Sequence, residues 1–123
     1  MAIDTGSDEL WVNPECDDVT LEDSQRAECR GNGIYSASKS STSDVDKVIG
    51  PATETIKYGI GKVDMRYTTD DIGLPGSDIK LKSVQFAVAT NTEDLNEGIM
   101  GLSFGNGTNL KYPTSSMCSL TRR

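Results

Sequence analysis

The sequence predicts a single, mostly β domain, and its length of 123 residues is that of one domain. Two stretches alternate apolar and polar residues with the period of two that is typical of strands with one buried face. No apolar helical period persists for about twelve residues, so we expect no amphipathic helix of ordinary length. The apolar members of the two alternating stretches are Val63, Met65 and Tyr67, and then Ile79, Leu81, Val84, Phe86 and Val88.

The first predicted element is a short buried strand, Leu10-Trp11-Val12, which Asn13-Pro14 ends. Residues 15–33 are acidic and contain two glycines, which favours an exposed loop. Residues 36–43 consist mainly of Ser and Thr and are interpreted as a polar turn or linker.

The central predicted element is a β-hairpin. Its arms are residues 53–58 and 62–67, and Gly59 and Gly61 lie at its turn. After the turn Gly73-Leu74-Pro75-Gly76, residues 79–89 are expected to form half-buried antiparallel strands with their apolar members in the core.

Composition excludes several classes of function. The formal net charge of −7 argues against nucleic acid or an anionic membrane as a partner. The chain contains no His, which removes Ser-His-Asp and Cys-His catalysis and His-ligated metal sites. No apolar run approaches the ~20 residues of a membrane span. Carboxylate chemistry remains, and we expect neither a metal nor a cofactor.

One short motif indicates that chemistry. Asp4-Thr5-Gly6-Ser7, followed closely by Leu10-Trp11-Val12, resembles the active-site segment of the pepsin-like (A1-type) aspartic proteases. The tripeptide Asp-Thr-Gly alone arises by chance in roughly 2% of chains this long, and the alternative interpretation is a solvated turn.

Three later stretches match the same family in the expected order, which makes the set specific. They are residues 56–61, residues 97–105 with Ile99-Met100-Gly101 placed beneath the active-site turn, and the fungal-looking residues 109–114. The resemblance implies one lobe of a pepsin-like acid protease, antiparallel and partly barrel-like, incomplete at both ends. Residues 1–114 would form a partial N-terminal lobe, and residues 115–123 an unrelated polar tail containing Cys118.

The resemblance assigns roles to the residues of the motif. Two carboxylates held together share one proton, so one can take a proton from water while the other gives one to the scissile amide. Asp4 would be one of this pair. Gly6 would let backbone N–H groups approach its carboxylate, Thr5 would bond across to the opposite half of the site, and Ser7 would bond the outer oxygen of Asp4 and keep it acidic.

The predicted hairpin resembles the flap that closes over the substrate in this family. The Tyr58 hydroxyl would bond to the Trp11 indole N–H, which donates, and the Tyr58 ring would wall the first specificity pocket. Gly59 and Gly61 would let the flap approach the peptide and move. The alternative is an ordinary surface hairpin.

The resemblance also implies a disulfide between Cys16 and Cys29, which for a loop of this size would contribute roughly 3 kcal/mol. Two unpaired thiols are the alternative, and Cys118 is left over in either case. The family implies a secreted or vacuolar protein, although the chain shows no signal peptide.

The chain contains no second Asp-Thr-Gly or Asp-Ser-Gly. Three hypotheses follow. The chain is a lobe of an endopeptidase that acts on peptide or protein substrates and is inactive without a C-terminal lobe; or two copies bring their Asp4 residues together as a homodimeric protease; or the chain is a non-catalytic module that binds peptides.

Overall fold

The structure is a computed structural model that describes residues 2–16, 27, 30–31, 33–95 and 97–101. Within them the fold is mostly β, as the sequence predicted. The helical residues are two 3₁₀ turns of three residues each together with residues 27, 30 and 31, which lie in the stretch expected to be a loop. The elements in chain order are β1 (Ala2–Asp4), β2 (Leu10–Val12), η1 (Ala37–Lys39), η2 (Val45–Lys47), β3 (Thr53–Lys57), β4 (Lys62–Gly73), β5 (Lys80–Glu93) and β6 (Ile99–Gly101).

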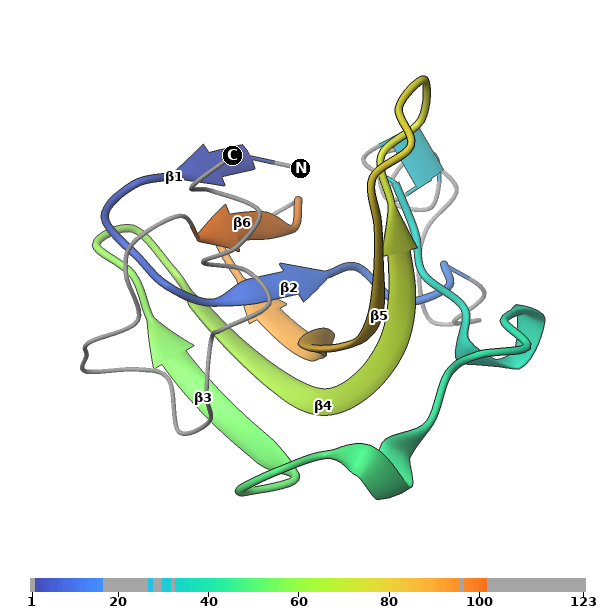
Figure 1. Ribbon diagram of the computed structural model, residues 1–123. Helices are drawn as coiled ribbons and strands as arrows, with labels where there is room; N and C mark the ends of the chain where they lie inside the picture. Colours follow the sequence, from blue (N-terminus) through green and yellow to red (C-terminus); the bar gives the residue numbers. More distant parts are fainter. Residues whose placement is uncertain (1, 17–26, 28–29, 32, 96, 102–123) are drawn as a thin grey trace.

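The six strands form one sheet in the order β1-β6-β2-β5-β4-β3. The long strands β4 and β5 bend strongly along their length, so that the sheet curls into part of a barrel (Figure 1). The expectation of an antiparallel sheet holds for three of the five pairings, whereas β1 with β6 and β2 with β5 are parallel. In each parallel pair the two strands are far apart in the chain. The chain crosses the sheet between them, so the later strand, β6 or β5, can run in the same direction as its earlier partner.

The predicted hairpin is present. Strand β3 pairs with β4 from Thr53 opposite Arg66 to Lys57 opposite Lys62, and Gly59 and Gly61 lie in the connection. Strand β4 extends past the predicted end at residue 67 to Gly73, because its second half pairs with β5. The second arm of the hairpin is therefore continuous with the part of β4 that pairs with β5.

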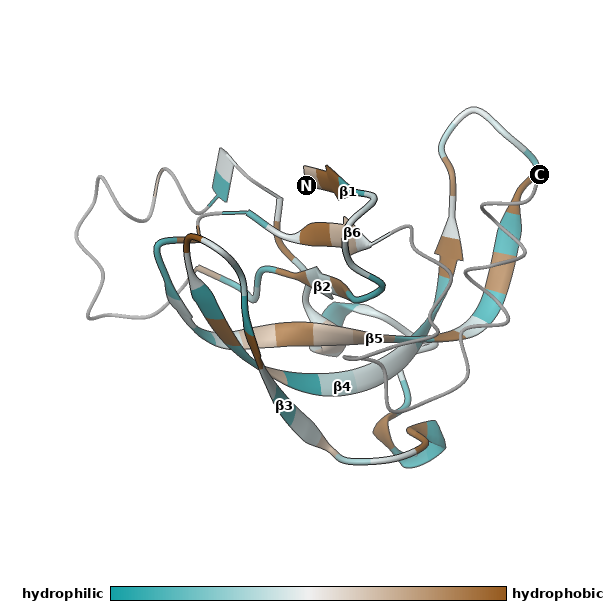
Figure 2. Cartoon of the chain, turned by 90° about the vertical axis from the view of Figure 1, so that its left-hand side faces the viewer, coloured by the Kyte–Doolittle hydropathy of each residue, from teal (hydrophilic) through white to brown (hydrophobic). Residues whose placement is uncertain are grey.

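The core lies where β2, β4 and β5 meet. Its buried cluster consists of Trp11, Ile56, Val63, Met65, Tyr67, Ala87 and Ala89. The inward residues of the predicted hairpin are thus core residues, as their alternation indicated. Figure 2 shows the apolar segments of β2, β5 and β6 gathered on neighbouring strands.

The prediction for the second alternating stretch was partly wrong. Val84 and Phe86 are buried, but Ile79, Leu81 and Val88 are only half-buried, whereas Ala87 and Ala89 are buried. Ala87 lies opposite Trp11 of β2 and opposite Tyr67 of β4. A small residue fits between two large aromatic ones, so packing buries the alanine face of β5 as well as the face that carries Val84 and Phe86.

Strand β6 lies between β1 and β2, which are themselves close in sequence (Figures 1 and 2). It runs parallel to β1, with Asp4 opposite Gly101, and antiparallel to β2, with Trp11 opposite Ile99. The predicted place of Ile99-Met100-Gly101 beside the Asp4 turn is therefore confirmed.

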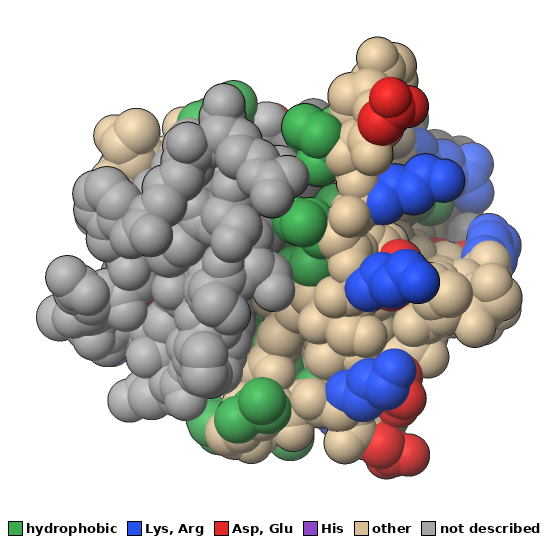
Figure 3. Space-filling view, in the orientation of Figure 1, with side chains coloured by type: hydrophobic (Ala, Val, Ile, Leu, Met, Phe, Trp, Pro, Cys, Tyr) green, Lys and Arg blue, Asp and Glu red, His purple; other side chains and the backbone are tan. Residues whose placement is uncertain are grey.

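Lys and Arg side chains form a row along one side of the face seen in Figure 3, despite the net negative charge. Within the part of the chain that the structure describes, no helix has the length and apolarity needed to cross a membrane. The predictions for Cys29, for residues 109–114 and for the tail 115–123 with Cys118 fall outside the described residues.

Candidate active site

Asp4 is the last residue of β1, and the chain turns immediately after it. Its carboxylate accepts two hydrogen bonds from that turn: Oδ1 from the Gly6 N–H at 2.9 Å, and Oδ2 from the Ser7 hydroxyl at 2.5 Å. The bond from Ser7, and then the bond from Gly6, lower the pKa of Asp4 below its usual value, against a small opposing effect of burial. The turn therefore favours the ionised carboxylate.

Close backbone contacts with β6 support the segment that follows the Asp4 turn. The Gly101 N–H donates to the Glu9 carbonyl at 2.8 Å. A Cβ at Gly101 would lie 2.6 Å from the Glu9 nitrogen and 2.7 Å from the Asp8 carbonyl carbon, so any side chain would force the strands apart. Glycine at this position lets β6 support the loop that carries Asp4.

The hairpin meets the same region through Tyr58. The Trp11 indole N–H donates to the Tyr58 hydroxyl at 3.1 Å, as predicted, and Trp11 is fully buried. Burial raises the pKa of Tyr58, the negative charges of Glu9 and Asp4 raise it further, and hydrogen bonds with Trp11 and Ser7 oppose the rise. Tyr58 thus lies within electrostatic reach of Asp4 and beside Ser7.

The other predicted site residues lie in the turn after Asp4 and in the connection of the hairpin. Thr5 and Gly6 are exposed, Ser7 is buried, Gly59 is exposed and Gly61 is half-buried. Cys16 is buried and disulfide-bonded, but Cys29 lies outside the described residues, and the pairing of these two cysteines stays a prediction. Across the described part of the chain, no group of three His, Cys, Asp or Glu residues is placed to hold a metal ion.

Sequence reasoning missed one buried acid beside this site. Glu9 is fully buried directly before β2. The pKa of Tyr67 is raised well above its usual value, first by burial and then by the nearby Glu9 carboxylate. An acidic residue that follows Asp8 and precedes a short strand gives no periodic signal, and its burial is visible only in the folded chain, where it lies near Tyr67 of β4.

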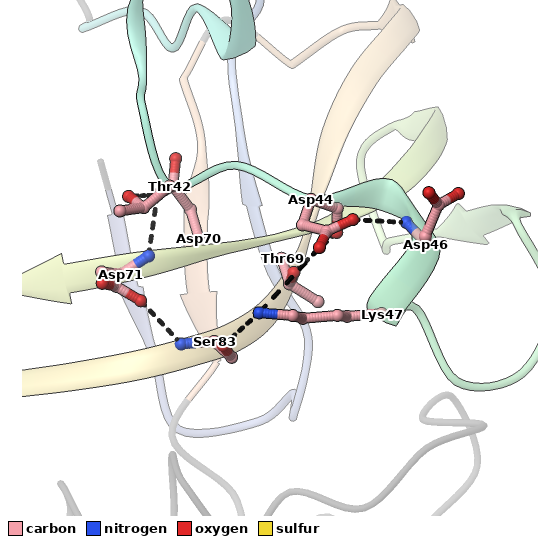
Figure 4. Close-up of polar contacts among 8 residues, drawn as sticks. All are labelled: Thr42, Asp44, Asp46, Lys47, Thr69, Asp70, Asp71 and Ser83. Carbon is pink, nitrogen blue, oxygen red and sulfur yellow. Dashed lines mark hydrogen bonds and ion pairs between the residues drawn. The ribbon is translucent and has the colours of Figure 1, made fainter.

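A second missed acid joins the Ser/Thr-rich turn to the sheet. Asp70 of β4 is buried and accepts hydrogen bonds from the Tyr35 hydroxyl at 2.7 Å, the Thr42 hydroxyl at 2.5 Å and the Asp71 N–H at 2.7 Å. Nearby, Thr69 donates to the Asp44 carbonyl at 2.6 Å (Figure 4). These residues are structural, since they hold residues 40–44 against β4.

Asp4 lies at the end of β1 in an Asp-Thr-Gly-Ser turn, next to β6 and near Tyr58 of the hairpin. This arrangement is that of a pepsin-like aspartic protease domain. The chain belongs to the eukaryotic aspartyl protease family, whose profile matches residues 1–119.

Three of its relatives are fungal proteins. It is 33% identical to podosporapepsin of Podospora anserina over 120 residues, which is 94% of this chain and 26% of that protein. It is 36% identical over 105 residues to the probable aspartic-type endopeptidase OPSB of Arthroderma benhamiae, and 34% identical over 108 residues to candidapepsin-3 of Candida albicans. The matched region spans 85% of this chain in both cases, and 20% and 25% of those two proteins.

Proposed function

We propose that this chain supplies one catalytic carboxylate and the flap of an aspartic endopeptidase. The observation that carries the proposal is the environment of Asp4, whose two carboxylate oxygens accept separate hydrogen bonds from Gly6 and Ser7. Two further observations support the proposal: the chain belongs to the eukaryotic aspartyl protease family, and the charge of Asp4 contributes to the raised pKa of Tyr58 in the hairpin.

In this proposal Asp4 is the ionised member of a carboxylate pair. The lowered pKa of Asp4 keeps it charged at mildly acidic pH, where it draws a proton from the attacking water. The second carboxyl holds a proton and donates it to the nitrogen of the scissile amide as the C–N bond breaks. These 123 residues hold no second Asp-Thr-Gly or Asp-Ser-Gly, so the partner carboxyl comes from another lobe or from a second copy.

The substrate in this proposal is a peptide with bulky apolar residues on both sides of the cleaved bond. Supporting this, the ring of Tyr58 is anchored beside Asp4 through Trp11, and the hairpin carries Ile60, which is 81% exposed, at its tip. Apolar surface on a hairpin above a carboxylate suits apolar peptide side chains. We also propose secretion, because one matched relative is named secreted aspartic protease 3.

The experiment measures binding of two peptides that share the same apolar side chains. In one of them a secondary alcohol replaces the scissile amide and mimics the tetrahedral intermediate. If Asp4 contacts the reacting group, the alcohol peptide binds at least about tenfold more tightly than the plain peptide, because one hydrogen bond to a charged group is worth that much. Asp4→Asn is expected to abolish the difference, and Asp8→Asn, the same change four residues later, to preserve it.

The outcome separates the three hypotheses. Equal binding of the two peptides, unaffected by Asp4→Asn, would identify a non-catalytic peptide-binding module and overturn the proposal. Cleavage of a denatured protein between pH 3 and 6 that rises with the square of chain concentration, and is lost in Asp4→Asn, would show that a second copy supplies the partner carboxyl. Discrimination that depends on Asp4, without cleavage, is expected for a lobe that needs a different partner.

A further inference from the structure

The two glycines of the hairpin have different surroundings. A Cβ at Gly59 would have no atom within 4 Å, whereas one at Gly61 would lie 2.5 Å from the Glu93 carbonyl oxygen and 2.8 Å from Leu95 Cγ. Neither glycine has a positive φ, so the backbone conformation alone demands glycine at neither position. Space is what requires glycine at residue 61.

The surface that Gly61 contacts is the C-terminal end of β5. Lys62 pairs with Glu93 in the sheet, and the Lys62 ammonium lies 3.4 Å from a Glu93 carboxylate oxygen. Leu95 packs against the buried core cluster. The second arm of the hairpin is therefore held against a part of the molecule that is itself anchored.

The first arm is held independently. Tyr58 accepts from the Trp11 indole, and its N–H donates to the Gly61 carbonyl at 2.7 Å, which joins the two arms directly below the turn. Gly59 and Ile60 are the exposed residues beyond these attachments.

We propose that Gly61 is a positioning residue, whose close contact with Glu93 and Leu95 sets the position of the hairpin and hence of the Tyr58 hydroxyl. The part of the hairpin that responds to a bound peptide is then limited to Gly59 and Ile60. This inference rests on the proposed function, in which the hairpin covers a peptide, and it separates two glycines that the sequence alone treats alike.

The chain contains a single tryptophan, so Trp11 gives one indole N–H resonance by NMR, and its exchange with solvent reports the bond to Tyr58. Gly61→Ala is expected to shift this resonance and to speed its exchange about tenfold, which corresponds to the loss of one hydrogen bond. Tyr58→Phe, which removes the acceptor, should give the same signature. Gly59→Ala is the matched control and should leave resonance and exchange unchanged.

A second variant covers the case in which Gly61→Ala fails to fold. Leu95→Ala adds no atom and removes the side chain against which Gly61 packs, so it too should speed indole exchange while amide exchange in the centre of β4 stays slow. Unchanged indole exchange in Leu95→Ala, or in folded Gly61→Ala, would overturn the proposal.

The test does not depend on catalysis. The alcohol peptide is expected to bind more weakly to Gly61→Ala and normally to Gly31→Ala, which also adds a Cβ in open space but lies outside the hairpin. Equal affinities of Gly61→Ala and the unmodified chain would overturn the proposal. Indole exchange that responds as expected in a chain that does not discriminate the two peptides would instead overturn the proposed function and leave the anchoring role of Gly61.

Discussion

At the scale of single residues, the acidity of Asp4 is produced by the four-residue turn that contains it. Both hydrogen bonds to its carboxylate come from residues two and three positions later in the chain. Because these donors stabilise the charged form, they lower the pKa of Asp4 without any cationic partner.

Ser7→Ala is expected to raise the pKa of Asp4, because it removes the larger of the two stabilising hydrogen bonds. The measurement is an NMR titration of the Asp4 carboxyl carbon, which requires no activity. Ser38→Ala, on the exposed turn, is the control. A titration of Asp4 that is the same in Ser7→Ala and in the unmodified chain would show that the Ser7 hydroxyl does not stabilise the carboxylate.

At the scale of secondary-structure elements, β6 and the Ser/Thr-rich turn are each attached by a few specific contacts. Gly101 allows β6 to approach the loop after Asp4, and Asp70 collects hydroxyl and N–H donors from the turn and from its own strand. Each attachment therefore depends on one residue, Gly101 for β6 and Asp70 for the Ser/Thr-rich turn, and no neighbouring residue takes over its role when it is replaced.

Gly101→Ala is expected to destabilise the fold by at least about 1–3 kcal/mol, the usual cost of overpacking, because its Cβ meets backbone atoms that cannot rotate away. Denaturant unfolding measures the loss, with Gly59→Ala as the same change made in open space. Equal midpoints for the two variants would contradict the close approach of β6 to the Asp4 loop.

Asp70→Asn is expected to cost about 1.5–3 kcal/mol at pH 7, because Asp70 is buried and its donors lose a charged acceptor. Burial opposes ionisation of Asp70, but bonds from Thr42, Tyr35, Ser40 and the Asp71 N–H outweigh it and lower its pKa. A lowered pKa contributes stability that is complete above the unfolded value of about 3.9 and is lost as the pH falls through the folded value.

The difference in unfolding free energy between the unmodified chain and Asp70→Asn should therefore be constant from pH 5 to 7 and shrink below about pH 4. Asp71→Asn, one residue away and exposed, is the control, because an amide oxygen still accepts the Ser83 N–H that Asp71 accepts at 2.9 Å. A difference that grew on acidification would contradict the sign of the Asp70 shift.

At the scale of the whole molecule, the sheet ends in β1 on one side and β3 on the other. Among the described residues, no strand pairs with the outer edge of β1, and Ile3 of this strand is 72% exposed beside Asp4. An apolar edge strand is a template for pairing with another chain.

Ile3→Lys is expected to lower self-association of the 123-residue chain, because a charged side chain on an edge strand disfavours pairing between copies. Sedimentation velocity over a range of concentrations measures the effect. Ile60→Lys, which replaces an equally apolar and exposed residue in a turn, should leave association unchanged. Equal effects of the two substitutions would show that general hydrophobicity, and not the β1 edge, drives association.

Local pattern was sufficient to predict the strands of the hairpin and β2, whereas the bond between Trp11 and Tyr58 was predicted from the resemblance to the pepsin-like proteases. Alternation marked Val63, Met65 and Tyr67 as core residues because period two directly reflects which side of a strand is buried. The same reasoning wrongly placed Val88 in the core and missed the burial of Ala87, because burial along β5 depends on the size of the residues opposite it on β2 and β4.

The sequence by itself determined the family, the mostly β character, the candidate carboxylate and the residue types that surround it, because these depend on short motifs and on spacing along the chain. Only the tertiary structure showed that Glu9 and Asp70 are buried, that β6 lies between β1 and β2, and that Gly61 has no space for a side chain while Gly59 does. Those properties arise from contacts between residues far apart in the chain, for which local hydropathy and turn chemistry carry no signal.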